Sequence, residues 1–288
     1  MKILAIGDFH GAFPSKLRKK IMKEKFDIIV STGDFCYDKE LERLFFKYSY
    51  GTDKELWEFI GKSKNSYLER KNLLAGFRVL KKLKRLGKPV ITVTGNWDPV
   101  DYEEVGFPRV RDPNSKRFKS FIKKMDFKII DFKRMKYSSL NFVGYPRSTY
   151  PGKTNFHIQK KFKERFKGEI WEIFDKIKFD NEKYFKIFKR LIDKNTIFIS
   201  HNTPYRTKLD MIKKEIQKGR HYGSYLVKKI IKELKPRLVI CGHMHENQGI
   251  QRIGRTLVVN IGAAYKSKAA IIDYPENEKD KIEIRLIK

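Results

Sequence analysis

Short apolar runs recur along the chain, and each one stops at a polar or glycine-containing turn. They occupy residues 3–6, 28–30, 90–93, 197–199 and 238–241. Brief runs rich in isoleucine and valine, bounded by turn residues, are typical of strands. The hydrophobic pattern therefore predicts a strand at each of these five positions.

Between the predicted strands, apolar residues recur every three or four positions, which indicates helices. Residues 16–25 read as a surface helix, and residues 36–87 as a helical connection that ends at Gly87 and Pro89. A short helix is expected at 118–125, a long helical segment at 156–191, and helix over most of 209–234 with an interruption at 219–223. Strands thus alternate with helices along most of the chain.

The remaining apolar segments predict further strands. Residues 128–131 and 140–144 are expected to pair with each other, and residues 249–253, 256–260, 269–273 and 282–287 to form an antiparallel sheet that closes the fold. No internal repeat or low-complexity linker interrupts the sequence. The chain is therefore interpreted as a single domain, residues 1–288, with helical insertions at about 36–87 and 152–194.

Each of the five apolar runs named first is followed by a side chain of a type that can bind metals. The first run leads into Asp8 and His10, and the last leads into His243 and His245. In an extended chain alternate side chains share a face, so the last two imidazoles should point the same way. The ends of the three intervening runs carry Asp34, Asn96 and His201. Oxygen and nitrogen ligands at five strand ends favour a metal site over isolated turn residues.

The charge balance changes the picture of the partners. The chain has 65 Lys and Arg against 34 Asp and Glu, a formal net charge of +31. Such a field favours acidic partners such as phosphates, nucleic acid or anionic membrane, although solvated basic faces would give the same number. The lysine-rich, isoleucine-rich and glutamine-poor composition is similar to that of hyperthermophile proteins, but glutamate does not rise with lysine.

Two helical segments could contact nucleic acid. The helix near residues 70–88 is strongly basic and is either a solvated face or a contact for a phosphate backbone. Aromatic residues alternate with lysines in 156–191, where they could stack bases, but helical spacing favours packing on the central sheet or a subunit contact in a homo-oligomer.

Cysteine usage and hydropathy bear on location. Cys36 and Cys241 are interpreted as small buried residues because two thiols do not make a disulfide framework in a chain of 288 residues. The first apolar run is too short for a signal peptide, and no segment approaches a membrane span. A cytoplasmic protein without membrane insertion is expected.

The residues at the strand ends also carry a family resemblance. Asp8-Phe9-His10, Gly33-Asp34, Gly95-Asn96-Trp97-Asp98, His201 and Gly242-His243-Met244-His245 stand in the order of the five sequence blocks of the calcineurin-like metallophosphoesterases. The resemblance implies an α/β (α+β) fold, a four-layer αββα sandwich of two mixed sheets flanked by helices. Residues 205–210 and 219–224 resemble archaeal members related to cyclic-nucleotide phosphodiesterases.

The resemblance further implies a dinuclear centre in which Asp34 bridges two ions. Asp8, His10 and His245 would bind one ion, and Asn96, His201 and His243 the other. Carboxylate, imidazole and amide ligands without thiolate suit divalent transition metals. Mn²⁺ is expected, with Ni²⁺, Fe or Zn²⁺ as alternatives. Such a pair would hold a bridging hydroxide for in-line attack at phosphorus.

The sequence departs from the family pattern at Trp97. The family usually has a histidine there, placed to help protonate the leaving oxygen, and an indole cannot do so. Trp97 could instead wall a pocket against a base or phenyl ring, or simply pack. His221 either supplies the proton or binds phosphate, or is a loop histidine hydrogen-bonded to backbone. Asn96, Trp97 and Arg220 are the expected substrate contacts, and His221 the expected catalytic residue.

Together these features predict a dinuclear metal-dependent phosphodiesterase acting on nucleotide-like or aryl diesters. A nuclease or a phosphomonoesterase is the alternative among enzymes. A non-catalytic nucleic-acid-binding protein with structural metals is the alternative outside them. Small phosphodiesters or nucleotides are the expected substrates, and the charge of +31 leaves nucleic acid open as a partner.

Overall fold

Two mixed sheets form the centre of the molecule. The computed structural model describes residues 1–49, 54–99, 114–146, 170–213, 218–277 and 279–288. The first sheet has the strand order β12-β11-β1-β2-β3-β4 and the second β5-β6-β7-β8-β10-β9. Within each sheet the middle strands run parallel, and antiparallel strands lie at one or both edges.

The strands of the first sheet are β1 (Lys2–Ile6), β2 (Ile28–Ser31), β3 (Val90–Thr92), β4 (Lys128–Ile129), β11 (Ala269–Asp273) and β12 (Glu283–Ile287). Those of the second are β5 (Arg134–Tyr137), β6 (Leu140–Tyr145), β7 (Ile197–Ser200), β8 (Leu238–Cys241), β9 (Gly249–Ile253) and β10 (Thr256–Asn260). All five of the strands expected from the first group of apolar runs are present.

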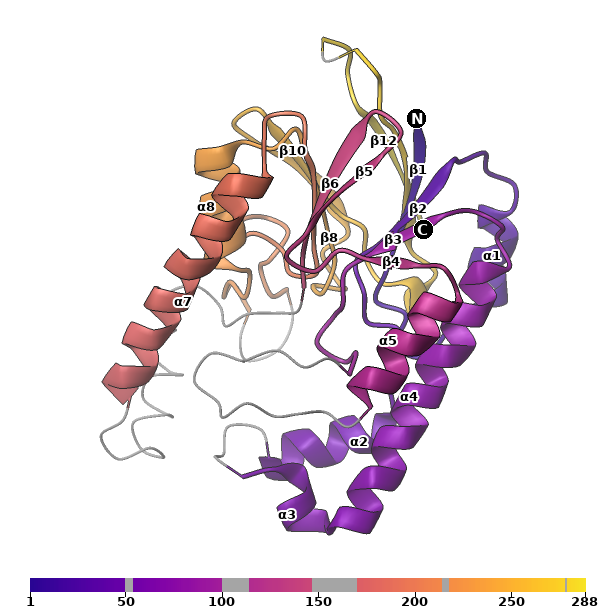
Figure 1. Cartoon of the computed structure of the whole chain (residues 1–288), viewed down its shortest axis with the longest axis vertical. Coiled ribbons are helices and arrows are strands. Elements are labelled where there is room, and N and C mark those ends of the chain that lie inside the picture. Colours follow the sequence, from indigo (N-terminus) through magenta and orange to yellow (C-terminus); the bar gives the residue numbers. More distant parts are fainter. Residues whose placement is uncertain (50–53, 100–113, 147–169, 214–217, 278) are drawn as a thin grey trace.

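Helices cover the outer surface of each sheet (Figure 1). The first sheet is covered by α1 (Ser15–Ile21), α4 (Lys62–Lys84) and α5 (Ser115–Lys124), and the second by α7 (Ile170–Leu191) and α8 (Tyr225–Leu234). Two short helices, α2 (Lys39–Leu44) and α3 (Leu56–Ile60), and the π-helix Phe45–Ser49 precede α4, and a 3₁₀ turn spans Ala264–Lys266. This arrangement confirms the predicted αββα sandwich.

The unbroken apolar runs are explained by two cores on opposite faces of the same strands. Ile3 and Ala5 of β1 join the core between the sheets, whereas Leu4 and Ile6 join the core under α1, α4 and α5. Side chains alternate across a strand, so a strand covered on both faces needs apolar residues at every position. A third core lies between the second sheet, α7 and α8.

Three topological predictions are wrong. Residues 128–131 and 140–144 do not pair as neighbouring strands: β4 pairs with β3, β6 pairs with β5 and β7, and a single bridge joins Asp131 to Gly144. The last four strands form two hairpins, one in each sheet, instead of one antiparallel sheet. Within the described parts of 209–234, 209–213 and 218–234, only Tyr225–Leu234 is helical, and Asp210 accepts the N–H groups of Arg206, Thr207 and Gly223 in the loop before it.

Other predictions fare better. The segment 36–87 contains the predicted helices, and Cys36 and Cys241 are free and buried. Residues 156–169 lie outside the described residues, whereas 170–191 form the predicted helix. The single-domain boundaries stay a prediction. Among the described residues, each helix falls short of the length or the apolar character that crossing a membrane would require.

Candidate metal centre

The candidate ligands meet where strands of both sheets end. Asp8 and His10 follow β1, Asp34 follows β2 and Asn96 follows β3, while His201 follows β7 and the pair His243 and His245 follows β8. The ligand atoms of Asp8, His10 and His245 lie within 4.8 Å of one another, as do those of Asp8, Asp34 and His201. Parallel strands present their carboxyl ends at one edge, which is how residues far apart in sequence converge.

In the first group, nitrogen lone pairs and carboxylates face a common point. His10 Nε2 lies 3.2 Å from His245 Nε2 and 3.4 Å from Asp34 Oδ2, and His245 Nε2 lies 3.5 Å from Asp8 Oδ1. Burial opposes charging of His10, but Asp34 and Asp8 outweigh it and raise its pKa. The carboxylates therefore favour positive charge at this point, and a metal ion bound to the neutral ring would supply that charge in place of the proton.

The second group, Asp8, Asp34 and His201, also brings electron-pair donors close together. His201 Nδ1 lies 2.7 Å from the carbonyl oxygen of Thr32, so Nδ1 carries the proton and donates it there. A metal ligand needs the neutral ring, in which Nε2 has only a lone pair, and this atom lies 2.8 Å from Asn96 Oδ1 and 3.5 Å from Asp34 Oδ2. Three electron-pair donors in this arrangement fit a bound cation.

Asp34 and His243 have the protonation states that ligands need. Burial alone would raise the pKa of Asp34, but His201, His10 and the backbone N–H of Trp97 hold it below its usual range. Burial and the neighbouring His201 lower the pKa of His243 to about 3, and the two rings are 5.0 Å apart. Metals bind carboxylates and neutral imidazoles, so both groups are prepared for coordination.

Four of the candidate ligands have a left-handed backbone. The φ angles are +52° at Asp8, +43° at His10, +54° at Asp34 and +64° at His243. The expectation of an extended His243-Met244-His245 segment is therefore wrong: a turn brings the two imidazoles to the site. Non-glycine residues in this region are strained, and such strain clusters at functional sites.

Two glycines allow the carboxylates to approach the backbone. A Cβ at Gly95 would lie 2.1 Å from Asp34 Oδ1, and one at Gly242 would lie 2.3 Å from Asp8 Oδ2. Side chains at these positions would collide with the candidate ligands. The glycines in the Gly-Asn and Gly-His blocks thus serve the geometry of the site.

Asp98 is a functional residue that the sequence interpretation missed. Its buried carboxylate accepts hydrogen bonds from the backbone N–H groups of Asp34, Phe35, Cys36 and Gly95 at 2.8–3.1 Å. Burial and the charge of Asp34 raise its pKa to about 7. Asp98 joins the loop after β2 to the loop after β3 and so positions both Asp34 and Asn96. Its place in the Gly-Asn-Trp-Asp block was the available signal.

Two tyrosines beside the first group were also missed. The hydroxyl of Tyr265 lies 3.3 Å from His245 Nδ1, and its ring lies 5.3 Å from that of His10. The ring of Tyr37 lies 5.2 Å from that of His10. These contacts orient the imidazoles, but no sequence spacing links the tyrosines to the strand ends.

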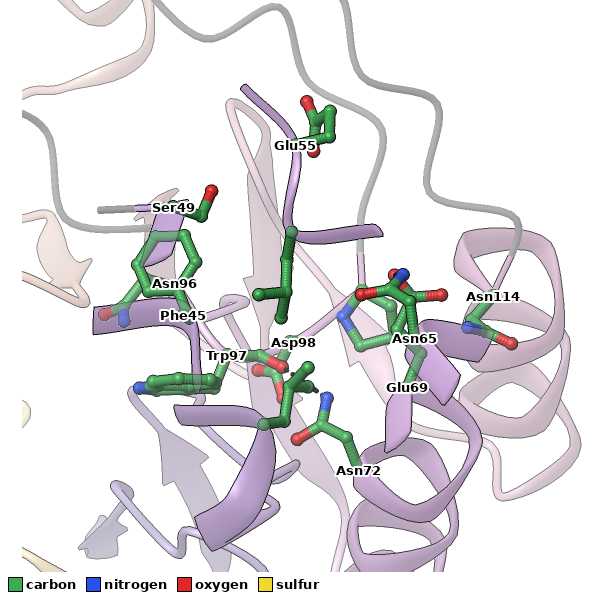
Figure 2. Close-up of a pocket in the computed structure, with 13 residues that line it drawn as sticks. Phe45, Ser49, Glu55, Asn65, Glu69, Asn72, Asn96, Trp97, Asp98 and Asn114 are labelled. Carbon is green, nitrogen blue, oxygen red and sulfur yellow. Dashed lines mark hydrogen bonds between the residues drawn. The ribbon is translucent and has the colours of Figure 1, made fainter. Parts of the chain in front are cut away.

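Trp97 lies between the candidate centre and a cavity. Its backbone N–H donates to Asp34 Oδ1 at 2.8 Å. Its side chain helps to line a cavity of about 210 Å³ between the loop after β3 and the helices that precede α5 (Figure 2). The cavity wall also contains Leu41, Phe45, Leu56, Pro99, three asparagines and the carboxyl groups of Glu55, Glu69 and Asp98. Asn96 belongs both to this wall and to the second ligand group.

His221 belongs to neither ligand group. Its Nδ1 lies 2.8 Å from Oδ1 of the buried Asp210, so its partner is a carboxylate and not the backbone. The adjoining Ser224 N–H donates to the carbonyl of Thr203 at 2.7 Å, two residues after His201. The carbonyl of Arg220 accepts from Ile212 N–H, and no described contact joins its guanidinium to the ligands.

The donor set fits a pair of divalent ions. Two overlapping groups share Asp8, imidazole nitrogens and carboxylate oxygens converge in each, and thiolates do not contribute to either group. Oxygen and imidazole ligands of this kind accept several divalent transition metals and do not select among them. The geometry thus provides a dinuclear site of unspecified metal.

Comparisons with known proteins agree with this geometry. An uncharacterized protein of Methanocaldococcus jannaschii is 29% identical over 265 residues, which cover 90% of this chain and 87% of that protein. Two solved structures share the fold: a phosphopantetheinyl hydrolase of Mycobacterium tuberculosis (13% identity, TM-score 0.50, 92% of this chain and 90% of that one) and a dimetal phosphatase of Danio rerio (10% identity, TM-score 0.50, 100% and 96%). The family model for calcineurin-like phosphoesterases matches residues 1–247. The chain therefore belongs to the calcineurin-like phosphoesterase family, whose membership indicates a metal-dependent phosphoric ester hydrolase.

Proposed function

We propose that this protein hydrolyses phosphodiesters of the nucleotide-like or aryl class. The observation that carries the proposal is the convergence of His201 Nε2 with Asn96 Oδ1 and Asp34 Oδ2 beside the group of Asp8, His10 and His245. The cavity next to Asn96 supports a diester substrate, because it offers a place for the organic group on the leaving side.

In the proposed centre, Asp8, His10 and His245 would hold one ion, Asn96, His201 and His243 would hold the other, and Asp34 would contribute to both. We expect Mn²⁺, with Ni²⁺, Fe or Zn²⁺ as alternatives. When bound, such ions activate water and neutralise charge on the phosphoryl oxygens. Thr32 and Tyr265 hold the imidazoles of His201 and His245 in orientation.

A single preparation tests this function. Metal content is measured by elemental analysis, and the same sample is assayed with cyclic nucleotides, oligonucleotides, aryl diesters and aryl monoesters. Two equivalents of a transition metal and a preference for diesters are expected. Faster hydrolysis of monoesters would favour a phosphatase, and metal binding without any hydrolysis would favour the non-catalytic alternative.

The Asp210–His221 pair gives a prediction about proton donation. Asp210 fixes His221 Nδ1 as the protonated nitrogen, so Nε2 can exchange a proton with a leaving oxygen once the ring is charged. We expect His221→Ala to lower turnover of alkyl diesters about 10²-fold and to spare aryl diesters, because good leaving groups need no acid. Steady-state kinetics on matched alkyl and aryl substrates measures this.

Asp210→Asn should reproduce that selective loss and change the pH dependence of the alkyl reaction, while Tyr205→Phe, beside the same ring, should change neither. If His221→Ala lowers both reactions equally, His221 binds phosphate and is not the acid. If it lowers neither, His221 has a structural role in the loop. Thermal unfolding of each variant separates these outcomes from loss of the fold.

A nuclease is the second candidate, and one feature of the surface favours it. The exposed cations of α4 adjoin those of α5, and Phe77 stacks on Phe121 at 3.9 Å between the two helices. Acidic residues are absent from α5, whereas α4 has Glu69 alone. We call the following residues the basic α4–α5 face: Arg78, Lys81, Lys82, Lys84, Arg85, Lys116, Arg117, Lys119, Lys123 and Lys124.

If the basic α4–α5 face follows a nucleic-acid backbone, oligonucleotide affinity should fall steeply with salt. Each neutralised phosphate contributes a slope of about −0.9 on duplex DNA and about −0.7 on single strands. Replacing Lys81, Lys82 and Arg85 with glutamate should flatten the slope by roughly two units, without changing turnover of a small diester. Fluorescence anisotropy over a salt series measures the slope.

The matched control reverses Lys229, Lys232 and Lys235 on and after α8, which covers the other sheet. This control has the same net charge as the α4 variant, so a general effect of charge would flatten both slopes equally. Equal slopes, or affinity that does not respond to salt, would assign the basic α4–α5 face to solvation.

A further inference from the structure

The cavity beside Trp97 has a chemical character that the metal centre does not explain. Three asparagine side chains, Asn65, Asn72 and Asn114, line it, and each is only 7–8% exposed. Figure 2 shows these amides on α4 and at the start of α5, facing the loop that carries Trp97 and Asp98. Buried amides are unfavourable unless they are hydrogen-bonded, so three around one cavity need partners.

Asn72 is the side chain whose partners are incomplete. Its Nδ2 donates to the carbonyl of Trp97 at 3.3 Å, but its buried Oδ1 has no hydrogen-bond partner among the described residues. In contrast, Asn65 Nδ2 donates to Glu69 at 2.7 Å. Asn72 therefore lines the cavity, has an unused acceptor that is closed to solvent in this conformation, and is linked directly to the backbone of Trp97.

The cavity shares two wall residues with the proposed reaction centre. Asn96 lines it and contacts His201, and Trp97 lines it and donates its backbone N–H to Asp34. A phosphoryl group held by these ligands would place one of its ester substituents at the cavity mouth. This geometry makes the cavity a subsite for an organic group attached through oxygen.

The residues that line the cavity limit which organic groups it can bind. Trp97, Phe45 and Leu56 supply apolar surface, and the amides supply hydrogen-bond donors and acceptors. The carboxyl groups of Glu55, Glu69 and Asp98 disfavour a second phosphate by like-charge repulsion. About 210 Å³ is smaller than the roughly 300–1,000 Å³ of a drug-sized site, so one ring system fits and a dinucleotide does not.

We propose that this cavity binds the uncharged heteroaromatic base of a nucleoside attached to the scissile phosphate. A turn of the Asn72 side chain would present its free oxygen to a donor on the base edge, since carboxamides pair with the donor and acceptor groups of bases, and Trp97 with Phe45 would contact the ring. The inference rests on the proposed phosphodiesterase function. It names the substituent that the enzyme would recognise and assigns a role to helices α2 to α4.

Binding of free nucleosides to metal-free protein tests the subsite separately from hydrolysis. Ligand-detected NMR is recorded with adenosine, uridine and methyl ribofuranoside as probes. At least one nucleoside should bind and the base-free sugar should not. Asn72→Leu should weaken nucleoside binding roughly three- to tenfold, the range expected for one lost hydrogen bond.

Leu41→Phe is a second variant that fills the cavity and leaves the amides intact, and it should weaken nucleoside binding as well. Asn277→Leu, in the loop between β11 and β12, is the control with unchanged binding. Absence of nucleoside binding to the parent protein, or equal affinity in all variants, overturns the subsite. Nucleoside binding that depends on Asn72 in a protein that hydrolyses no diester overturns the proposed function and leaves the subsite standing.

Discussion

Replacing Asp34 with asparagine is expected to abolish hydrolysis and to remove most of the stabilisation that metals give. Asp34 contacts His10 and His201, one from each ligand group, so its loss affects both ions. Asparagine retains an oxygen that can accept from the Trp97 N–H, so the loop is preserved while the charge is lost. Chelation of the parent protein should have the same effect on activity.

Thermal unfolding with and without metal measures the second half of this prediction. Ligands that bind only the folded state stabilise it by about 4 kcal/mol at 1,000 times their Kd. The parent protein should gain most of that amount on metal addition, and Asp34→Asn should gain much less. Asp126→Asn, an exposed carboxylate beside Lys128, is the control that should behave like the parent. Full activity in metal-free protein would contradict the proposed centre.

The position of the site could be predicted from local sequence, because each candidate ligand directly follows an apolar run that forms a strand. Five of the strands with parallel partners, β1, β2, β3, β7 and β8, lead into candidate ligands, and parallel strands end at the same edge. Asp8, Asp34 and His201 could therefore be brought together without knowing which sheet each strand joins. The core strands were recognisable because alternate side chains enter two different cores, so every position in such a strand is apolar.

Sheet membership could not be read in the same way. β4 and β6 are close in sequence, yet they lie in different sheets because β4 pairs with β3 and β6 pairs with β7. Such choices depend on contacts between residues far apart in the chain, which local patterns do not contain. The division of the last four strands into two hairpins has the same cause.

Within the site, the features missed are those set by backbone geometry and by contacts across loops. A positive φ at His243 is not expected for a histidine, so an extended segment was the natural interpretation. Asp98 reads as a turn residue before Pro99, and only the structure shows that its carboxylate joins two loops. The Asp210 partner of His221 lies eleven residues away across a bridge between Met211 and His221.

Trp97 leads to the prediction that tests the chemistry most directly. An indole beside the leaving oxygen cannot donate a proton readily, so Trp97 does not neutralise the negative charge that develops on that oxygen. Aryl diesters should therefore be cleaved much faster than alkyl diesters, and monoesters should be poor substrates. Because the Trp97 backbone is fixed by its hydrogen bond to Asp34, a histidine at this position would start from the same place next to Asn96.

Trp97→His should accordingly raise turnover of alkyl diesters by up to about 10²-fold and leave aryl diesters nearly unchanged, since general acid catalysis is typically worth 10²–10⁴-fold. Trp97→Phe is the control, because it keeps an aromatic ring and adds no proton donor. The gain should be lost at high pH, where a histidine near its ordinary pKa of about 6.5 is neutral. Equal rates for aryl and alkyl diesters in the parent protein and in His221→Ala would show that another group donates the proton, because neither Trp97 nor His221 would then limit the departure of a poor leaving group.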